Sequence, residues 1–161
     1  MERFKDYTLQ KYLQRLSERT PTPGGGSAAA LAGALGAALI SMVAQYSLGK
    51  GKPKAVEQKI KNILQQSEKL RKRLLQLVEL DAQAYLALVK SRKKDKKTQA
   101  AAKKRAREVP LEITQRCYEA VELTPYLVHH GNIYLISDIQ VGNELLLSAF
   151  KSAMINVQIN Q

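Results

Sequence analysis

Hydrophobic residues recur every three or four positions along most of the chain, a spacing typical of amphipathic helices. The pattern predicts a first helix over residues 6–19 and a long helix that begins near Pro53. In the long helix the steps between apolar positions alternate four and three, as the seam of a packed bundle requires. This seam consists of Val56, Ile60, Ile63, Ser67, Leu70, Leu74, Leu77, Asp81, Tyr85 and Leu88. Its length predicts a helix that runs along a whole bundle.

One carboxylate, that of Asp81, falls on this apolar seam. A buried carboxylate costs free energy unless it is paired, hydrogen-bonded or beside a polar cavity. Asp81 is therefore a functional acid in a cavity, a salt-bridged acid in the core, or an acid at the edge of the seam.

The segment from Pro21 to Ser27 contains two prolines and three glycines, and an almost uncharged run follows it. This run predicts a helix from Ser27 to Leu48, with Ser27 as its N-cap. Because the run is apolar on all sides, we expect an Ala/Gly-rich helix buried at the centre of the bundle. The backbone N–H groups of the loop and of the helix start suit an anionic group.

The middle of the chain predicts a connection and a fourth helix. Residues 91–102 lack an apolar stripe and are expected to form an exposed connection. The fourth helix extends roughly over residues 99–130, and Pro110 and Pro125 fall inside it. Each proline removes a backbone donor, so each should kink the helix or mark a boundary.

The last helix opens at Ser137 and Asp138 and carries two apolar faces. Two such faces predict contacts on both sides of the helix, one of them with another subunit, and Asp138 lies on one of these inward-looking stripes. Taken together, the elements predict an all-α protein, a mostly antiparallel bundle of about five helices. The length of 161 residues predicts one domain over residues 1–161.

The formal net charge of +12 is concentrated in two segments. Between Lys90 and Arg107 there are ten basic residues and one acid, and between Lys50 and Arg73 there are nine basic residues and two acids. Such segments attract nucleic acid, an anionic membrane or a polyanionic small molecule, or they are simply solvated helix faces. The scarcity of aromatic residues for base stacking weighs against nucleic acid.

The standard catalytic signatures are missing from the sequence. His129 and His130 are adjacent and lack the spacing of metal ligands, and the glycine loop does not match a phosphate-binding motif. Cys117 is expected to be a buried, inert thiol, and no metal site is expected. The remaining candidates are the glycine loop, Asp81, Asp138, and a polar cluster of His129, His130, Asn132 and Ser137. This set suits proton transfer in an enclosed pocket.

The single cysteine fits a reducing compartment, and the N-terminal residues lack the apolar core of a signal peptide. The apolar run of residues 28–44 is short for a membrane span and rich in Ala and Gly. We therefore expect a cytoplasmic protein without a membrane partner.

Several segments resemble one protein family. The stretch Pro23-Gly-Gly-Gly-Ser-Ala-Ala-Ala-Leu-Ala-Gly-Ala-Leu-Gly-Ala-Ala-Leu39 is similar to the signature of the formiminotetrahydrofolate cyclodeaminase / methenyltetrahydrofolate cyclohydrolase family. Further segments agree in order and spacing, and together they cover nearly the whole chain. They are Asp81-Ala-Gln-Ala-Tyr85, Val109-Pro-Leu-Glu-Ile113, Gly131-Asn132 with Ser137-Asp138, and Asn156-Val-Gln-Ile-Asn160.

The resemblance implies an all-helical fold, commonly a homodimer, that acts on the one-carbon group between N5 and N10 of tetrahydrofolate. Cyclodeamination closes the N5-formimino group onto N10 and releases ammonia. Hydrolysis opens the N5,N10-methenyl bridge to the 10-formyl form. Both reactions need protons to be moved, and neither requires a cofactor beyond the folate substrate.

Carried over residue by residue, the resemblance implies a ligand-contacting loop made by Pro23, Gly24, Gly25, Gly26 and Ser27. It implies a polar wall of Asn132, Ser137 and Asp138. Asp138 is the first choice for the general acid and base, and Asp81 is the second choice or an orienting partner. Lys50, with Lys52, Lys93 or Lys94, is expected to hold the glutamate tail of a folate.

The sequence departs from the family pattern at Tyr134, where a second asparagine is usual, and it stops at Gln161, where relatives continue with another helical segment. These departures favour an alternative, a non-catalytic helical protein that binds folate or a partner. A basic module that binds nucleic acid is the further alternative.

Overall fold

The computed structural model describes residues 3–160, and all of the regular structure in that range is helical. The described elements are η1 (Phe4–Asp6), α1 (Leu9–Ser17), α2 (Gly25–Ser47), α3 (Lys54–Ser91), α4 (Lys96–Val121), α5 (Thr124–His130), η2 (Ile133–Leu135) and α6 (Ile136–Ile159). The prediction of an all-α bundle is therefore confirmed.

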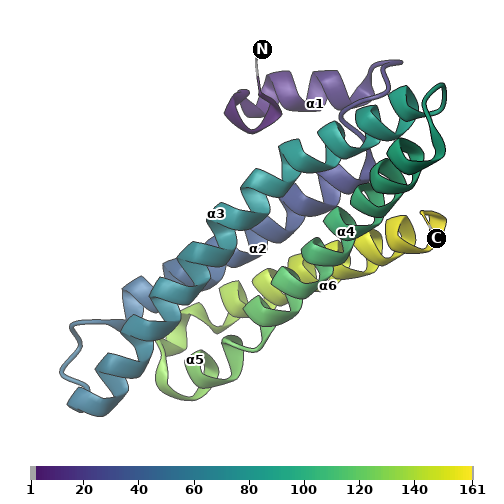
Figure 1. Ribbon diagram of the computed structural model, residues 1–161. Helices are drawn as coiled ribbons and strands as arrows, with labels where there is room; N and C mark the ends of the chain where they lie inside the picture. The colour runs from purple at the N-terminus through teal and green to yellow at the C-terminus, as the bar shows by residue number, and fades with distance from the viewer. Residues whose placement is uncertain (1–2, 161) are drawn as a thin grey trace.

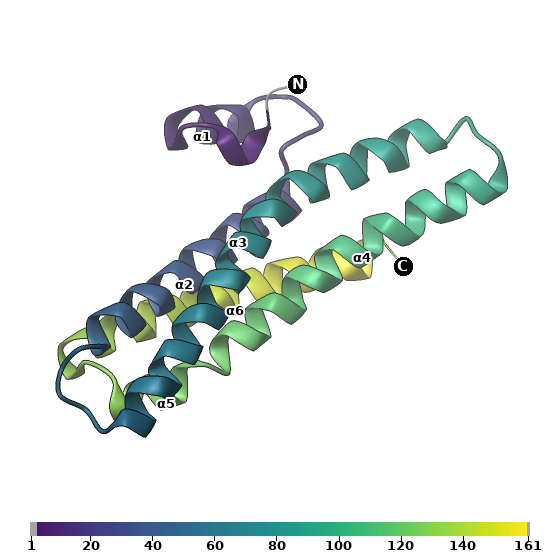
Figure 2. The same ribbon diagram turned by 60° about the vertical axis from the view of Figure 1, so that its left-hand side comes forward.

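Four long helices make up the body of the bundle (Figure 1). α2 packs mainly against α3 and α6, and α4 closes the opposite side by packing against the same two helices. The helix α1 lies outside this body, with η1 against α3, while α5 lies at the opposite end of the bundle. Figure 2 shows that the C-terminal part of α3 and the N-terminal part of α4 extend past the other helices as a two-helix arm.

Small residues let α2 approach its neighbours closely. A Cβ atom built on Gly36 would lie 2.8 Å from the carbonyl oxygen of Gly142 on α6, and one on Gly33 would lie 2.8 Å from the Cys117 sulfur. Both distances are shorter than a real side chain accepts, so glycine at these positions sets how tightly the helices pack. This is the physical reason for the Ala/Gly-rich composition of the helix.

The helix α2 is not enclosed on every side, contrary to the expectation of an all-round buried helix. Leu35 is 50% exposed and Tyr46 is 59% exposed in the single chain. By length and composition α2 is also the one helix in residues 3–160 that could cross a membrane, and 61% of its most apolar window is buried in the bundle. A core helix of a bundle has the same composition, and the contacts of α2 with α3 and α6 agree with that role.

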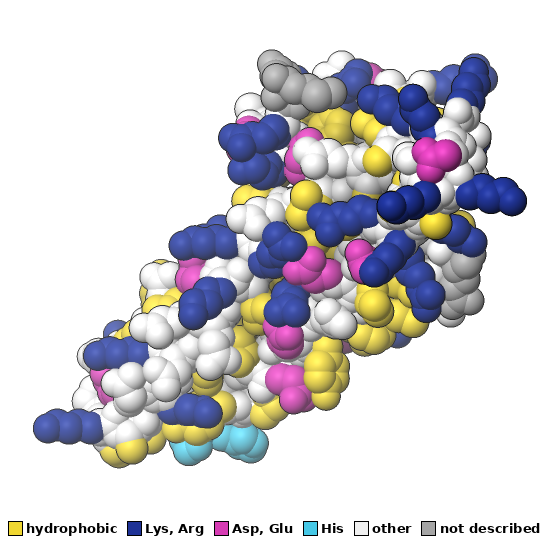
Figure 3. Space-filling view, in the orientation of Figure 1, with side chains coloured by type: hydrophobic (Ala, Val, Ile, Leu, Met, Phe, Trp, Pro, Cys, Tyr) yellow, Lys and Arg dark blue, Asp and Glu magenta, His cyan; other side chains and the backbone are white. Residues whose placement is uncertain are grey.

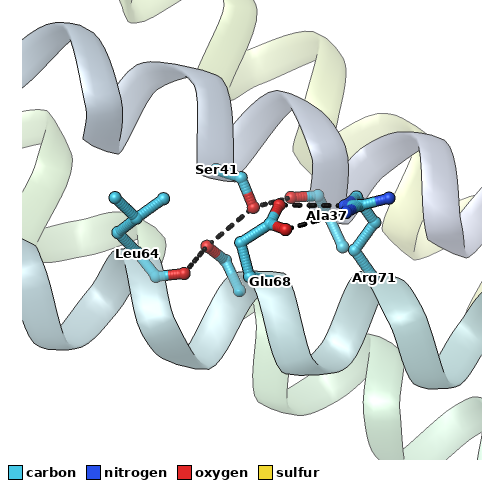
Figure 4. Close-up of polar contacts among 6 residues, drawn as sticks. Ala37, Ser41, Leu64, Glu68 and Arg71 are labelled. Carbon is cyan, nitrogen blue, oxygen red and sulfur yellow. Dashed lines mark hydrogen bonds and ion pairs between the residues drawn. The ribbon is translucent and has the colours of Figure 1, made fainter.

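A small polar network links α2 to α3 away from the glycine loop (Figure 4). Ser41 Oγ lies 2.9 Å from Ser67 Oγ, and Ser67 donates in turn to the carbonyl oxygen of Leu64 at 3.0 Å. Beside them, Arg71 donates two hydrogen bonds to the Glu68 carboxylate, which lowers the pKa of Glu68. The buried serines therefore keep their hydrogen bonds inside an otherwise apolar interface.

Three predicted boundaries were wrong. Gly24, not Ser27, is the N-cap of α2, because the helix begins two residues before Ser27. The predicted exposed connection over residues 91–102 shrinks to 92–95, because Asp95 caps α4 by accepting a hydrogen bond from the Thr98 backbone N–H at 2.9 Å. The predicted fourth helix is divided into α4 and α5 just before Pro125, whereas Pro110 lies inside α4.

Candidate functional site

A cavity of about 300 Å³ lies where the glycine loop meets α3, α4 and α6. The loop and the start of α2 form one wall, and the base of the two-helix arm forms another. The end of α6 completes the cavity. Its lining residues are Pro21, Thr22, Gly24, Gly25, Gly26, Asp81, Ala84, Tyr85, Leu88, Ala106, Asn156, Ile159 and Asn160.

Asp81 is the one carboxylate in this lining. It lies directly against the backbone of α2, since a side chain on Gly26 would overlap the Asp81 carboxylate. Burial raises the pKa of Asp81 to about 6, and a hydrogen bond from the Ser27 backbone N–H opposes the rise. No basic side chain is among the causes of this shift, which argues against a structural ion pair. Near neutral pH such a carboxyl can both accept and donate a proton.

Not all of the predicted loop residues face the cavity. The side chain of Ser27 is fully buried, and its hydroxyl donates to the carbonyl oxygen of Val78 at 3.0 Å. Pro23 is also buried and is not part of the lining. Gly24, Gly25 and Gly26 do line the cavity. The loop therefore offers a ligand its glycine backbone, while Ser27 holds the start of α2 against α3.

A second cavity, of about 380 Å³, lies at the other end of α2. The Asn132 backbone N–H donates to Ser47 Oγ at 2.8 Å, which fixes the turn after α5 against the end of α2. Tyr134, which replaces the asparagine of the family pattern, is 84% exposed at this cavity. The lining residues are Ser47, Lys50, Lys52, Gly131, Asn132, Ile133 and Tyr134.

Asp138 and Ser137 lie in the first turn of α6, at the same end of the bundle as the second cavity. Ser137 is exposed and Asp138 is half-buried, and neither lines the two cavities described above. The stripe that carries Asp138 faces outward in the single chain. The buried stripe of α6 is instead Ile139, Gly142, Leu146, Ala149, Ala153 and Val157.

The structure thus places the predicted site residues at opposite ends of the helical bundle within a single chain. Gly26 and Asp81 lie at the start of α2, and Asn132 lies at its end. The 23 residues of α2 separate these ends by roughly 33 Å at about 1.5 Å per residue. A single chain therefore does not bring Asp81 and Asp138 into one reaction site.

Sequence reasoning missed three side chains in the first cavity, those of Tyr85, Asn156 and Asn160. The signal was present, because all three stand in segments that carried the family resemblance. Asn160 Nδ2 donates to the carbonyl oxygen of Ala106 at 3.1 Å and so ties the end of α6 to α4. These residues give the cavity a polar side that apolar periodicity alone does not reveal.

Metal and thiol chemistry find little support in the part of the chain that the structure describes. No group of three or more His, Cys, Asp or Glu side chains is placed there to hold a metal ion. Cys117 is fully buried, and burial raises the pKa of its thiol to about 12, as expected for an inert cysteine.

Comparison with known proteins identifies relatives along nearly the full length. The family described as formiminotransferase-cyclodeaminase matches residues 8–161. Methenyltetrahydrofolate cyclohydrolase of Methylorubrum extorquens is 37% identical over 163 residues, which cover 95% of this chain and 78% of that protein. Formimidoyltransferase-cyclodeaminase of Gallus gallus is 31% identical, but the match covers only 30% of its length.

The fold has a solved counterpart as well. The crystal structure of formiminotetrahydrofolate cyclodeaminase from Thermotoga maritima superposes with a TM-score of 0.92 at 29% identity. The match covers 97% of this chain and 79% of that one. The arrangement of helices described above is therefore shared with that protein.

The buried carboxyl predicts a pH-dependent cost in stability. The pKa of Asp81 rises from 3.8 to about 6 on folding. Its ionisation therefore costs nothing below about pH 4 and costs about 2–3 kcal/mol above pH 7. We expect Asp81→Asn to raise the free energy of unfolding at pH 7.5 by about 2 kcal/mol and to leave it unchanged at pH 4. Urea titration at both pH values measures this, and an equal effect at both would contradict it.

Proposed function

Because this chain belongs to the formiminotransferase-cyclodeaminase family, we propose that it interconverts one-carbon units carried by tetrahydrofolate. Two reactions of the family are candidates. One is the hydrolysis of 5,10-methenyltetrahydrofolate to the 10-formyl form, and the other is the cyclisation of 5-formiminotetrahydrofolate with release of ammonia. The observation that carries the proposal is Asp81, a carboxyl with a pKa of about 6 held against the glycine loop in a cavity.

Both reactions pass through a tetrahedral carbon bonded to N5 and N10, and both need a group that takes and returns a proton. A carboxyl with a pKa close to the working pH is suited to this exchange. The backbone N–H groups at the start of α2 are suited to the polar edge of the ligand, because they are free of intrahelical partners. No cofactor beyond the folate is needed for this chemistry.

The function is tested by following the absorbance of the methenyl group. We expect the protein to remove that absorbance from 5,10-methenyltetrahydrofolate, or to generate it from the formimino substrate while ammonia is released. We expect Asp81→Asn to slow turnover by about a hundredfold. Binding without turnover would favour the non-catalytic alternative. If neither folate bound, the proposal would be wrong.

We further propose that the protein acts as a homodimer whose paired surface lies on α2 and α6. Apolar side chains on the outer faces of these adjacent helices remain exposed in the single chain. They are Leu35 at 50%, Tyr46 at 59%, Val141 at 54%, Ile155 at 57% and Ile159 at 74% exposure. Large apolar side chains left exposed on two adjacent helices are typical of a subunit interface.

A two-fold axis across the middle of α2 would set the two copies antiparallel. The first cavity of one copy would then lie beside the second end of its partner, because the axis exchanges the two ends of the helix. Asp138 and Asn132 of the partner subunit would face the cavity that contains Asp81. This arrangement would reunite the residues that a single chain separates.

Mixing two inactive variants tests the shared site. Asp81→Asn and Asp138→Asn are each expected to be inactive as homodimers. Random pairing makes half of the dimers mixed, and each mixed dimer keeps one intact site, so about a quarter of the wild-type activity should return. As a control, Asp81→Asn mixed with Gly26→Val should stay inactive, since both changes affect the same half of the site. No recovery in the first mixture would mean that the site is complete within one chain.

The glutamate tail of the folate is proposed to leave the first cavity toward the two-helix arm. Figure 3 shows Lys and Arg side chains gathered over the end of the molecule where α3 and α4 meet. A shallow cavity there shares Leu88 with the first one. It is lined by Leu88, Ser91, Arg92, Lys96, Gln99, Ala100 and Lys103. Lys93 and Lys94 lie in the connection beside it. Lys50 and Lys52 lie at the opposite end of the bundle, in the lining of the second cavity.

Affinity for folates of different tail length tests this path. Each exposed ion pair contributes up to about 1 kcal/mol, so a pentaglutamate should bind roughly fivefold more tightly than a monoglutamate at low salt. Arg92→Gln with Lys96→Gln should remove the difference, and Lys59→Gln with Lys61→Gln on the distant part of α3 should preserve it. Equal affinity for the two tail lengths would exclude a tail site on the arm.

A further inference from the structure

One side chain of α1, that of Tyr12, is buried in the bundle, and Leu16 packs against the core beside it. Tyr12 is 4% exposed and is the only buried residue of α1, whereas Leu9 and Leu13 on the same helix are 71% and 61% exposed. The ring of Tyr12 belongs to the main hydrophobic core. A tyrosine in such a position needs a partner for its hydroxyl, because an unpaired buried hydroxyl is costly.

The partner of Tyr12 is Ser27, and the direction of the hydrogen bond follows from the chemistry. The two hydroxyl oxygens lie 3.0 Å apart. Ser27 has one hydroxyl hydrogen and uses it to donate to the carbonyl oxygen of Val78 at 3.0 Å. A carbonyl only accepts, so the bond between the hydroxyls must be donated by Tyr12. A one-way chain therefore runs from α1 through α2 to α3.

This chain ends at the Val78 carbonyl, close to the candidate catalytic carboxyl. Val78 lies three residues before Asp81 on α3, which is close to one helical turn. The hydroxyl of Ser27 contacts the first of these residues, while its backbone N–H is directed at the carboxylate of the second. The orientation of Ser27 thus decides how well its N–H meets Asp81.

We propose that Tyr12 is a positioning residue for Asp81, acting through Ser27. Its hydroxyl fixes the hydroxyl of Ser27 against α3 and thereby holds the Ser27 backbone N–H on the carboxylate. Nothing in the amphipathic pattern of α1 distinguishes Tyr12 from an ordinary core residue. The assignment rests on the proposed function, because it presumes that Asp81 takes part in turnover.

The surroundings of Asp81 make its titration a clean reporter of this contact. The titratable groups that face it in the described residues are Tyr12 from α1 and Tyr85 from α3. The other cavity residues, on the glycine loop, α2, α4 and α6, are glycine, alanine, proline, threonine, isoleucine and asparagine, which do not titrate in this range. A change at Tyr12 therefore acts on Asp81 without a second charged group between them.

The experiment measures the Asp81 carboxyl directly in the absence of substrate. The chain contains four aspartates, so carbon-13 carboxyl NMR can be assigned with single Asp→Asn variants. Tyr12→Phe keeps the ring in the core and removes the donor. Since a hydrogen bond to a carboxylate lowers its pKa, we expect the Asp81 pKa to rise by about half a pH unit in this variant. The control is Tyr7→Phe, whose ring packs edge-to-face against Phe4 at 5.6 Å and which should leave the Asp81 pKa unchanged.

Kinetics and a second variant complete the test. Tyr12→Phe should lower kcat by about fivefold with little change in KM, and the pH profile of kcat should move up with the Asp81 pKa. Ser27→Ala removes the same relay, so Tyr12→Phe added to Ser27→Ala should have almost no further effect on the Asp81 pKa. A wild-type protein without turnover would defeat the proposed function and leave the NMR shift as the measure of the relay. An Asp81 pKa that is equal in wild type and Tyr12→Phe would overturn the positioning role.

Discussion

The close contact of α2 with its neighbours is the constraint on which the rest of the structure depends. Glycine at Gly33 and Gly36 brings the helix within reach of α4 and α6, where any larger side chain would overlap its neighbour. The same tight packing continues to Gly26, which lies against Asp81. One helix thus sets both the spacing of the core and the position of the carboxylate, and its composition serves both.

That packing also explains why the candidate site lowers the stability of the folded protein. A carboxyl held against a helix start loses hydration, and the single N–H of Ser27 replaces only part of it. The bundle can accommodate this cost because the surrounding core is large, with α2, α3, α4 and α6 all contributing buried residues. A site that is locally unfavourable is typical of residues kept for chemistry rather than for stability.

The sequence predicted the helices and the inward position of Asp81, because both depend on local periodicity. The predicted seam of α3 puts Asp81 on the inner side of the helix, and the structure has it half-buried there. Beyond Leu77 the seam departs from the prediction, because Ala82 and Ala84 are buried and Tyr85 is 44% exposed. The separation of Asp81 from Asn132 and Asp138 could not be predicted in this way. It depends on which end of the bundle each helix presents, and periodicity within one helix does not contain that information. The role of Ser27 was misplaced for a similar reason. A serine before an apolar run suggests an N-cap, and only the contact with Val78 shows that its hydroxyl is used inside the bundle.

The two-helix arm has a mechanical consequence for the first cavity. Figure 2 shows the arm leaving the body of the bundle at about the level where α2 begins. The cavity lies at this fork, between Tyr85 and Ala106 on the arm and Gly25 on the body. Bending of α3 and α4 at the base of the arm would therefore widen or narrow the cavity, while the four-helix part keeps its packing. The hydrogen bond from Asn160 to Ala106 joins the end of α6 to the base of the arm and so limits such a movement.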